Sequence, residues 1–233
     1  MDANLSSLKK TARIAGLWYL LLTITGAYSV IYVPSKIMVR GDAAATANNI
    51  LAHELLFRTG TVSDLISNTI FMVLALALYR LFKQVNERHA KLLVAFVFVQ
   101  IPAVFIVEAF NFTSLMIMKG EILKTFELAQ RQDFAMLFLK INDYGTIVGM
   151  IFWGLWLLPF GLLVYKSEFI PRILGVLLIL GGVAYMIESF TQLLLPNYGT
   201  LVSRFTIIFY TIGELSMMFW LLIKGVKTKV STT

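Results

Sequence analysis

Four carboxylates lie inside long apolar stretches of this 233-residue chain: Asp64, Glu108, Glu188 and Glu214. An ionisable side chain at the centre of a bilayer costs about 2.5–3.5 kcal/mol on insertion scales, so it usually faces the protein interior and marks a functional site. Clustered carboxylates attract cations and can carry protons. The four acids therefore predict an acidic cavity that binds or moves a small cationic or amphiphilic ligand.

Polar side chains accompany these acids at helical spacing. Three of the acids are followed by an Asn or Gln three or four residues later, and residues at that spacing share one face of a helix. Tyr185 and Thr211 each lie three residues before an acid. We therefore predict that the polar faces converge on one ligand-binding site open to the outside. Its expected residues are Asp64, Asn68, Glu108, Asn111, Glu188, Gln192 and Glu214.

The residue types argue against several other chemistries. The chain has no cysteine and two histidines, and His53-Glu54 does not continue into a zinc-protease motif, because Phe57 occupies the place of the second histidine. Asp64 is the one aspartate within the apolar stretches, whereas intramembrane aspartyl proteolysis uses two. We therefore predict no metal site, no catalytic residue and no cofactor.

Composition identifies the elements that must position the acids. Hydrophobic residues make up 58% of the chain and charged residues 14%. A helix needs about 20 apolar residues to cross the hydrocarbon core, and in lipid the backbone must satisfy its own hydrogen bonds. The sequence predicts an all-α, polytopic membrane protein, a bundle of six transmembrane helices within a single domain over residues 1–233. The expected spans are residues 14–34, 60–82, 92–118, 144–165, 173–195 and 205–223.

Two outer connections also have helical patterns. Residues 43–58 begin after Asp42, a candidate N-cap, and end before Gly60, a candidate stop. Residues 121–142 carry an apolar stripe at helical spacing. We expect both to form short amphipathic outer helices, lying at the interface or leading into the next span.

The placement of basic residues predicts the topology. The 20 Lys and Arg residues divide twelve to eight between the two sides of the expected bundle, and the richer side holds both termini. The positive-inside rule then predicts a multi-pass protein of the cell membrane with both termini in the cytoplasm. The net charge of +7 indicates contact with the lipid bilayer and its anionic headgroups, not with nucleic acid. The oligomeric state stays open.

One block of the sequence resembles a known family. It reads GDAAATANNI at 41–50, ELLFRTG at 54–60 and then Asp64-Leu65, and RIAG at 13–16 adds to the likeness. These segments are similar to a bacterial and archaeal family of six-span membrane proteins, the domain of unknown function 4386. The resemblance implies an integral membrane protein and no activity. It also draws together a group at the outer mouth, to which we assign Asn49, His53, Glu54 and Arg58.

Three functional hypotheses follow from the sequence. The first is a non-enzymatic protein that binds or transports the cationic or amphiphilic ligand through the acidic cavity. The second is a membrane-embedded enzyme that acts on lipid with a carboxylate as general base. The third is a structural or regulatory membrane subunit whose acids only pair helices, as Glu54 and Arg58 could do at their spacing of four residues.

Overall fold

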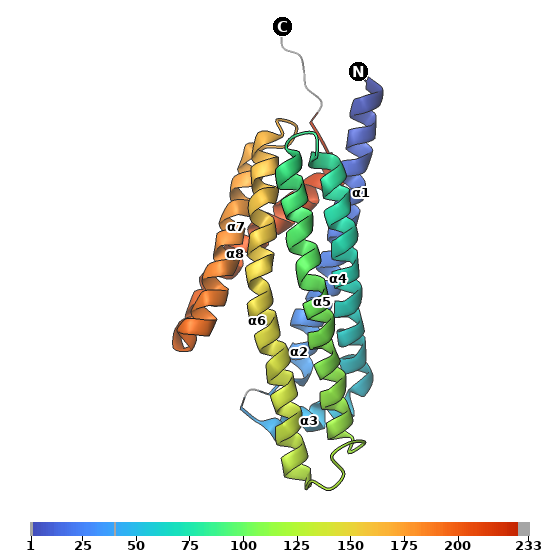
Figure 1. Cartoon of the computed structure of the whole chain (residues 1–233), viewed down its shortest axis with the longest axis vertical. Coiled ribbons are helices and arrows are strands. Elements are labelled where there is room, and N and C mark those ends of the chain that lie inside the picture. The colour runs from blue at the N-terminus through green and yellow to red at the C-terminus, as the bar shows by residue number, and fades with distance from the viewer. Residues whose placement is uncertain (1, 40, 228–233) are drawn as a thin grey trace. The chain divides into compact units, whose positions relative to one another are not determined.

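Every regular element in the described part of the chain is a helix (Figure 1). The computed structural model describes residues 2–39 and 41–227. Six helical segments there are long and apolar enough to cross a membrane, which confirms the all-α class and the six spans. These segments are Ser6–Ile37, Glu54–Phe82 (α4), Glu87–Met118 (α5), Leu128–Lys166 (α6), Arg172–Leu194 (α7) and Pro196–Lys224.

The first and last spans each contain a short π-helical segment. The first comprises α1, the π-turn η1 and α2; the last comprises α8 and the π-turn η2. Single π-turns occur often at functional sites, because they shift side chains relative to a regular helix. The bounds are α1 Asp2–Ala27, η1 Tyr28–Tyr32, α2 Val33–Ile37, α8 Pro196–Phe219 and η2 Trp220–Lys224.

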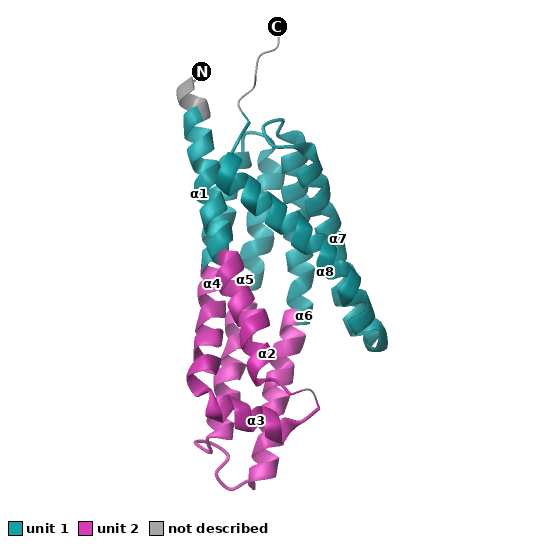
Figure 2. Cartoon of the chain, turned by 180° about the vertical axis from the view of Figure 1, so that it is seen from behind, with its two compact units in different colours: residues 1–21, 70–100, 147–233 teal, residues 22–69, 101–146 magenta. Residues whose placement is uncertain are grey.

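The chain divides into two compact units, coloured separately in Figure 2. Unit 1 comprises Met1–Leu21, Ile70–Gln100 and Ile147–Thr233. Unit 2 comprises Leu22–Thr69 and Ile101–Thr146. The long helices α4, α5 and α6 contribute residues to both units. The single domain over residues 1–233 stays a prediction.

Unit 1 has an aromatic centre and two close glycine contacts. Trp156 is 1% exposed, and its ring lies 4.9 Å from Phe71 and 5.4 Å from Phe160, centroid to centroid. Helices α6 and α7 meet where Gly161 faces Gly175 and where Gly154 faces Gly182. A Cβ added to Gly161 would lie 2.6 Å from the carbonyl oxygen of Gly175, so the absent side chains are what allow this approach.

Two hydrogen bonds tie segments of unit 1 that are far apart in the sequence. The Arg13 guanidinium donates a hydrogen bond from Nη2 to the carbonyl of Ile223 (3.1 Å). The backbone N–H of Lys227 donates to the carbonyl of Phe169, in the turn between α6 and α7 (2.8 Å). Hydrogen bonds thus join α1 to η2, and the residues after η2 to the turn between α6 and α7.

Unit 2 encloses the short outer helix α3 (Ala43–Ala52). Ala47 and Ile50 of α3 are buried among Phe57, Leu115 and Leu139, which come from α4, α5 and α6. The expected helix near residues 43–58 is thus present, but its apolar face is packed inside the unit. It ends at His53, and α4 begins at once with Glu54.

Two expected boundaries were wrong. Gly60 does not stop a helix, because it lies inside α4, where a Cβ would come within 2.9 Å of the Val33 side chain. The helix expected over residues 121–142 begins only at Leu128; it leads into the next span, one of the two expected arrangements, because α6 runs unbroken from Leu128 to Lys166. Packing explains this extension: Ala135 is buried and its carbonyl accepts a hydrogen bond from Ser114 of α5 (3.0 Å).

The N-cap of α3 supports a first prediction. The Asp42 carboxylate accepts a hydrogen bond from the backbone N–H of Ala45 (2.8 Å), as expected. We expect Asp42→Ala to lower the free energy of unfolding by about 1 kcal/mol, because an N–H at the helix start loses its partner. Denaturant titration of the purified protein in detergent measures this loss. Asp42→Ser is the control, because it keeps an acceptor; an equal loss in both variants would contradict the capping role.

Candidate functional site

Glu214 lies on α8 in unit 1 between two tyrosine hydroxyls. The hydroxyl of Tyr19, on α1, donates to Oε2, and the hydroxyl of Tyr185, on α7, donates to Oε1, both at 2.8 Å. Tyr19 is itself 1% exposed and packs edge-on against Trp156. The carboxylate therefore joins three helices of unit 1 through neutral donors.

Glu188, on α7 in unit 1, is held by side chains of α8. Ser203 donates to Oε1 (2.6 Å) and Thr206 to Oε2 (2.5 Å). Gln192, one turn further along α7, donates to Oε1 (3.2 Å), as its spacing predicted. Glu188 is only 5% exposed, so these hydroxyl and amide donors replace its contacts with water.

Two stacked tyrosines lie where α7 and α8 meet. Tyr185 and Tyr210 lie face to face, with ring centroids 4.0 Å apart and ring planes within 6°. Tyr185 belongs to α7 and donates its hydroxyl to Glu214 of α8, whereas Tyr210 belongs to α8. Trp153 of α6 borders the pair edge-on, 5.8 Å from the ring of Tyr185.

Unit 2 contains the other two intramembrane acids. Glu108, on α5, is 7% exposed and accepts hydrogen bonds from Asn111 on the same helix (2.9 Å) and from Asn142 on α6 (3.0 Å). Asp64, on α4, accepts from Asn68 (3.0 Å) and from Ser29 in the π-turn η1 (3.2 Å). Asp64 and Glu108 are close enough to interact electrostatically.

None of the four acids forms an ion pair with a described basic residue. The ion pairs within residues 2–39 and 41–227 belong to Glu54, Glu87 and Glu121. Asp64 and Glu108 share unit 2, and Glu188 and Glu214 share unit 1. A single cavity common to all four stays a prediction. Across the described residues, no group of three His, Asp or Glu side chains is placed to hold a metal ion.

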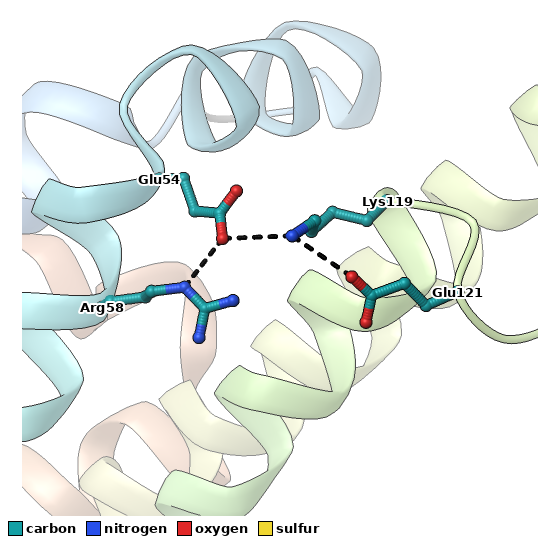
Figure 3. Close-up of polar contacts among 4 residues, drawn as sticks. All are labelled: Glu54, Arg58, Lys119 and Glu121. Atoms are coloured by element: carbon teal, nitrogen blue, oxygen red, sulfur yellow. Dashed lines mark hydrogen bonds and ion pairs between the residues drawn. The ribbon is translucent and has the colours of Figure 1, made fainter.

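The expected outer-mouth residues form mostly structural contacts in unit 2. Glu54 accepts from Arg58 (2.7 Å) and lies 3.3 Å from Lys119, which also pairs with Glu121 (3.2 Å), as Figure 3 shows. The acids on either side of this ammonium, first Glu121 and then Glu54, raise the pKa of Lys119 through hydrogen bonds. The expected ion pair between Glu54 and Arg58 is thus present. It belongs to a row of four charged side chains that connects the start of α4 with the turn after α5.

The other two outer-mouth residues lie around α3. The Asn49 amide donates to the carbonyl of Ile37 (3.3 Å), which ties α3 to α2. His53 is exposed and forms the C-cap of α3. The place of Asn49 and His53 at the mouth of a ligand site stays a prediction.

Sequence reasoning missed most partners that come from neighbouring helices. Thr211, expected beside Glu214, is exposed, and Tyr185 bonds Glu214 although its spacing pointed to Glu188. One pattern in the sequence could have pointed to partners of this kind. Polar residues within an apolar stretch recur on one helix face, as at residues 203, 206, 210 and 214. Missed partners are Tyr19, Ser29, Asn142, Ser203 and Thr206.

Gln100 is a further polar residue that sequence reasoning passed over. It belongs to unit 1, near the middle of α5, and is 2% exposed. Neither its amide nitrogen nor its amide oxygen has a hydrogen-bond partner among the described residues. An unpartnered buried amide costs about 1–3 kcal/mol by mutational data, so Gln100 is a candidate contact for water or a polar ligand.

Comparisons with known proteins agree with this architecture. An uncharacterized protein of Archaeoglobus fulgidus is 31% identical over 111 residues, which cover 46% of this chain and 65% of that protein. The similarity thus spans just under two thirds of that relative's length. No solved structure matches the chain significantly. A sequence model of the family described as Domain of unknown function (DUF4386) matches residues 14–225. Because this match covers most of the chain, and six helices are fit to span a membrane, the chain is a membrane protein of the DUF4386 family.

Proposed function

We propose that this protein binds a small cationic or amphiphilic ligand at its intramembrane carboxylates and moves it through the membrane. The observation that carries the proposal is the neutral surroundings of the four acids. Hydroxyl and amide groups hold every one of them, and no described basic side chain pairs with them. A carboxylate in such a place lacks a fixed counter-charge, so a mobile cation is its natural partner.

The proposal also assigns the protein a membrane and an orientation. Both termini lie in the cytoplasm and the protein spans the cell membrane. The support is the excess of Lys and Arg on the side of the termini, including Arg13, Arg172 and Lys227. Anionic lipid headgroups are the expected partners of this basic side.

A second candidate is a structural or regulatory subunit, and one observation favours it. Each acid is bonded to a second helical segment: Glu214 to α1 and α7, Glu188 to α8, Glu108 to α6 and Asp64 to η1. Such bonds can serve to align helices alone. The two candidates differ in whether a ligand changes the stability of the folded protein.

Thermal melting in detergent from pH 4 to pH 8 separates them. We expect one class among inorganic cations, amines and lipids to raise the melting temperature of the wild type, because a ligand that binds only the folded state stabilises it. In Glu108→Gln, Glu188→Gln or Glu214→Gln, apparent affinity should fall at least tenfold, about 1.4 kcal/mol.

The matched control is Glu127→Gln, which removes the same charge from an exposed position before α6. This variant should retain the ligand effect. Lower melting in the three site variants, with no ligand effect in any protein, would overturn ligand binding and favour the structural subunit.

A further inference from the structure

We propose that the start of α5 is a binding site for one anionic phospholipid, whose phosphate lies at Arg88 and Lys91 and whose acyl chain follows Leu92, Ala95 and Val99. The inference goes beyond the proposed function, because none of the four intramembrane acids belongs to this site. It concerns unit 1 alone.

The first observation is a cleft on the surface of α5. It is lined by Glu87, Arg88, Lys91, Leu92 and Ala95, and its volume is about 440 Å³. Ligand sites in proteins commonly have volumes of about 300–1,000 Å³. The cleft is open, not enclosed, so a molecule that lies along the surface of the protein, as a lipid does, can enter it from the side.

The second observation is the charge of this cleft. Arg88 is exposed, and no ion pair among the described residues involves it. Lys91 pairs with Glu87 (3.0 Å), whose carboxylate also accepts a hydrogen bond from Tyr79 (3.3 Å). Two cations and one carboxylate line the cleft and give it a net charge of +1. A phosphate group complements that charge, and a guanidinium can form two parallel hydrogen bonds with its oxygens.

The third observation is an apolar strip that continues from the cations along the same helix. Arg88, Leu92, Ala95 and Val99 recur at spacings of three or four residues, which places them on one face of α5. Leu92 is 39% exposed and Val99 is 62% exposed, and Ala95 is exposed as well. This face therefore offers apolar surface to a lipid chain directly below the basic side chains.

The length of the strip matches one leaflet of a bilayer. The helix rises about 16 Å from Arg88 to Val99, and one leaflet contributes about 15 Å of the hydrocarbon core. Because the span of α5 begins at Glu87, the cations lie at its end and the apolar strip lies within it. A free phosphate would contact the cations alone, whereas a phospholipid would contact both parts of the site.

Native mass spectrometry of the purified full chain tests the site, with dioleoyl phosphatidylglycerol as the anionic probe and dioleoyl phosphatidylcholine as the zwitterionic one. We expect each chain to retain one phosphatidylglycerol at a concentration at which phosphatidylcholine is lost. Arg88→Gln should weaken the apparent affinity for phosphatidylglycerol by about tenfold, because hydrogen bonds between ionised groups are the strong ones. Arg88→Lys keeps the positive charge and should retain most of the binding.

Arg80→Gln is the matched control. Arg80 is exposed near the end of α4 and lies outside the cleft, so its loss removes the same charge and should leave the affinity unchanged. Glu87→Gln should act in the opposite direction. It removes the carboxylate that pairs with Lys91, so the affinity for phosphatidylglycerol should rise. A gain of binding cannot come from a variant that fails to fold.

Three results would overturn the site. Equal affinities for the two lipids, or an equal loss in Arg88→Gln and Arg80→Gln, would mean that general charge attraction explains the binding. Glycerol 3-phosphate that binds as tightly as phosphatidylglycerol would show that the apolar strip adds nothing. Arg88→Gln leaves all four intramembrane acids in place, so its effect on the lipid is independent of theirs.

Discussion

Trp156→Ala should lower the free energy of unfolding by about 3 kcal/mol, the low end of the range for removing a buried aromatic side chain. Trp156 is 1% exposed and contacts the rings of Tyr19, Phe71 and Phe160. The low end applies because lipid tails are as apolar as the helices themselves, so the hydrophobic effect adds little to the association of membrane helices. The expected cost is then mainly that of the lost packing contacts. Denaturant titration in detergent or lipid measures the change.

Phe205→Ala is the control for this prediction. Phe205 lies on α8 in the same unit but is 63% exposed, so its removal should change the free energy of unfolding by less than about 0.5 kcal/mol. Equal effects of the two substitutions would show that Trp156 is not the centre of unit 1. Because Trp156 packs on Tyr19, the donor to Glu214, its loss should also weaken any ligand effect that depends on Glu214.

Gly161→Ala should cost about 1–3 kcal/mol, although the change adds a single methyl group. That methyl would lie 2.6 Å from the carbonyl oxygen of Gly175, so α6 and α7 would have to separate. Gly149→Ala is the same substitution on the same helix, and no atom lies within 4 Å of its new Cβ. The control should be neutral or slightly stabilising, because Ala favours helix over Gly.

Unfolding measurements on Gly161→Ala and Gly149→Ala side by side test this explanation. If Gly149→Ala destabilises the protein as much as Gly161→Ala, the loss would come from the helix itself and not from its contact with α7. Near-wild-type unfolding of both variants would mean that α6 and α7 separate at little cost.

Hydropathy alone predicted the fold class and the six spans, because the bilayer imposes both the length and the apolarity of each span. It could not predict where the helices extend beyond the apolar core. Gly60 illustrates the limit: glycine at the start of an apolar stretch resembles a helix stop, yet here it makes room for Val33. Local spacing holds no information about that neighbour, which comes from a different helix.

The partners of the four acids also divide into those on the same helix and those on a neighbouring helix. Asn68, Asn111 and Gln192 were predictable as partners, because a spacing of three or four residues places them on the face of their own acid. Tyr19 and Asn142 were not, because their contacts depend on how neighbouring helices are aligned along their axes. The bond from Tyr185 to Glu214 shows why alignment matters: a shift of one turn between α7 and α8 would break it.

The glycine contacts of unit 1 fix such an alignment between α6 and α7. Gly154 and Gly161 lie seven residues apart on one helix, and Gly175 and Gly182 lie seven apart on its antiparallel neighbour. Seven residues are two turns, about 10.5 Å, so both contacts can form in only one register. Sliding either helix by one turn would press a side chain onto a carbonyl. Any rearrangement within unit 1 must therefore move residues 154–161 of α6 and residues 175–182 of α7 together, as one rigid hairpin.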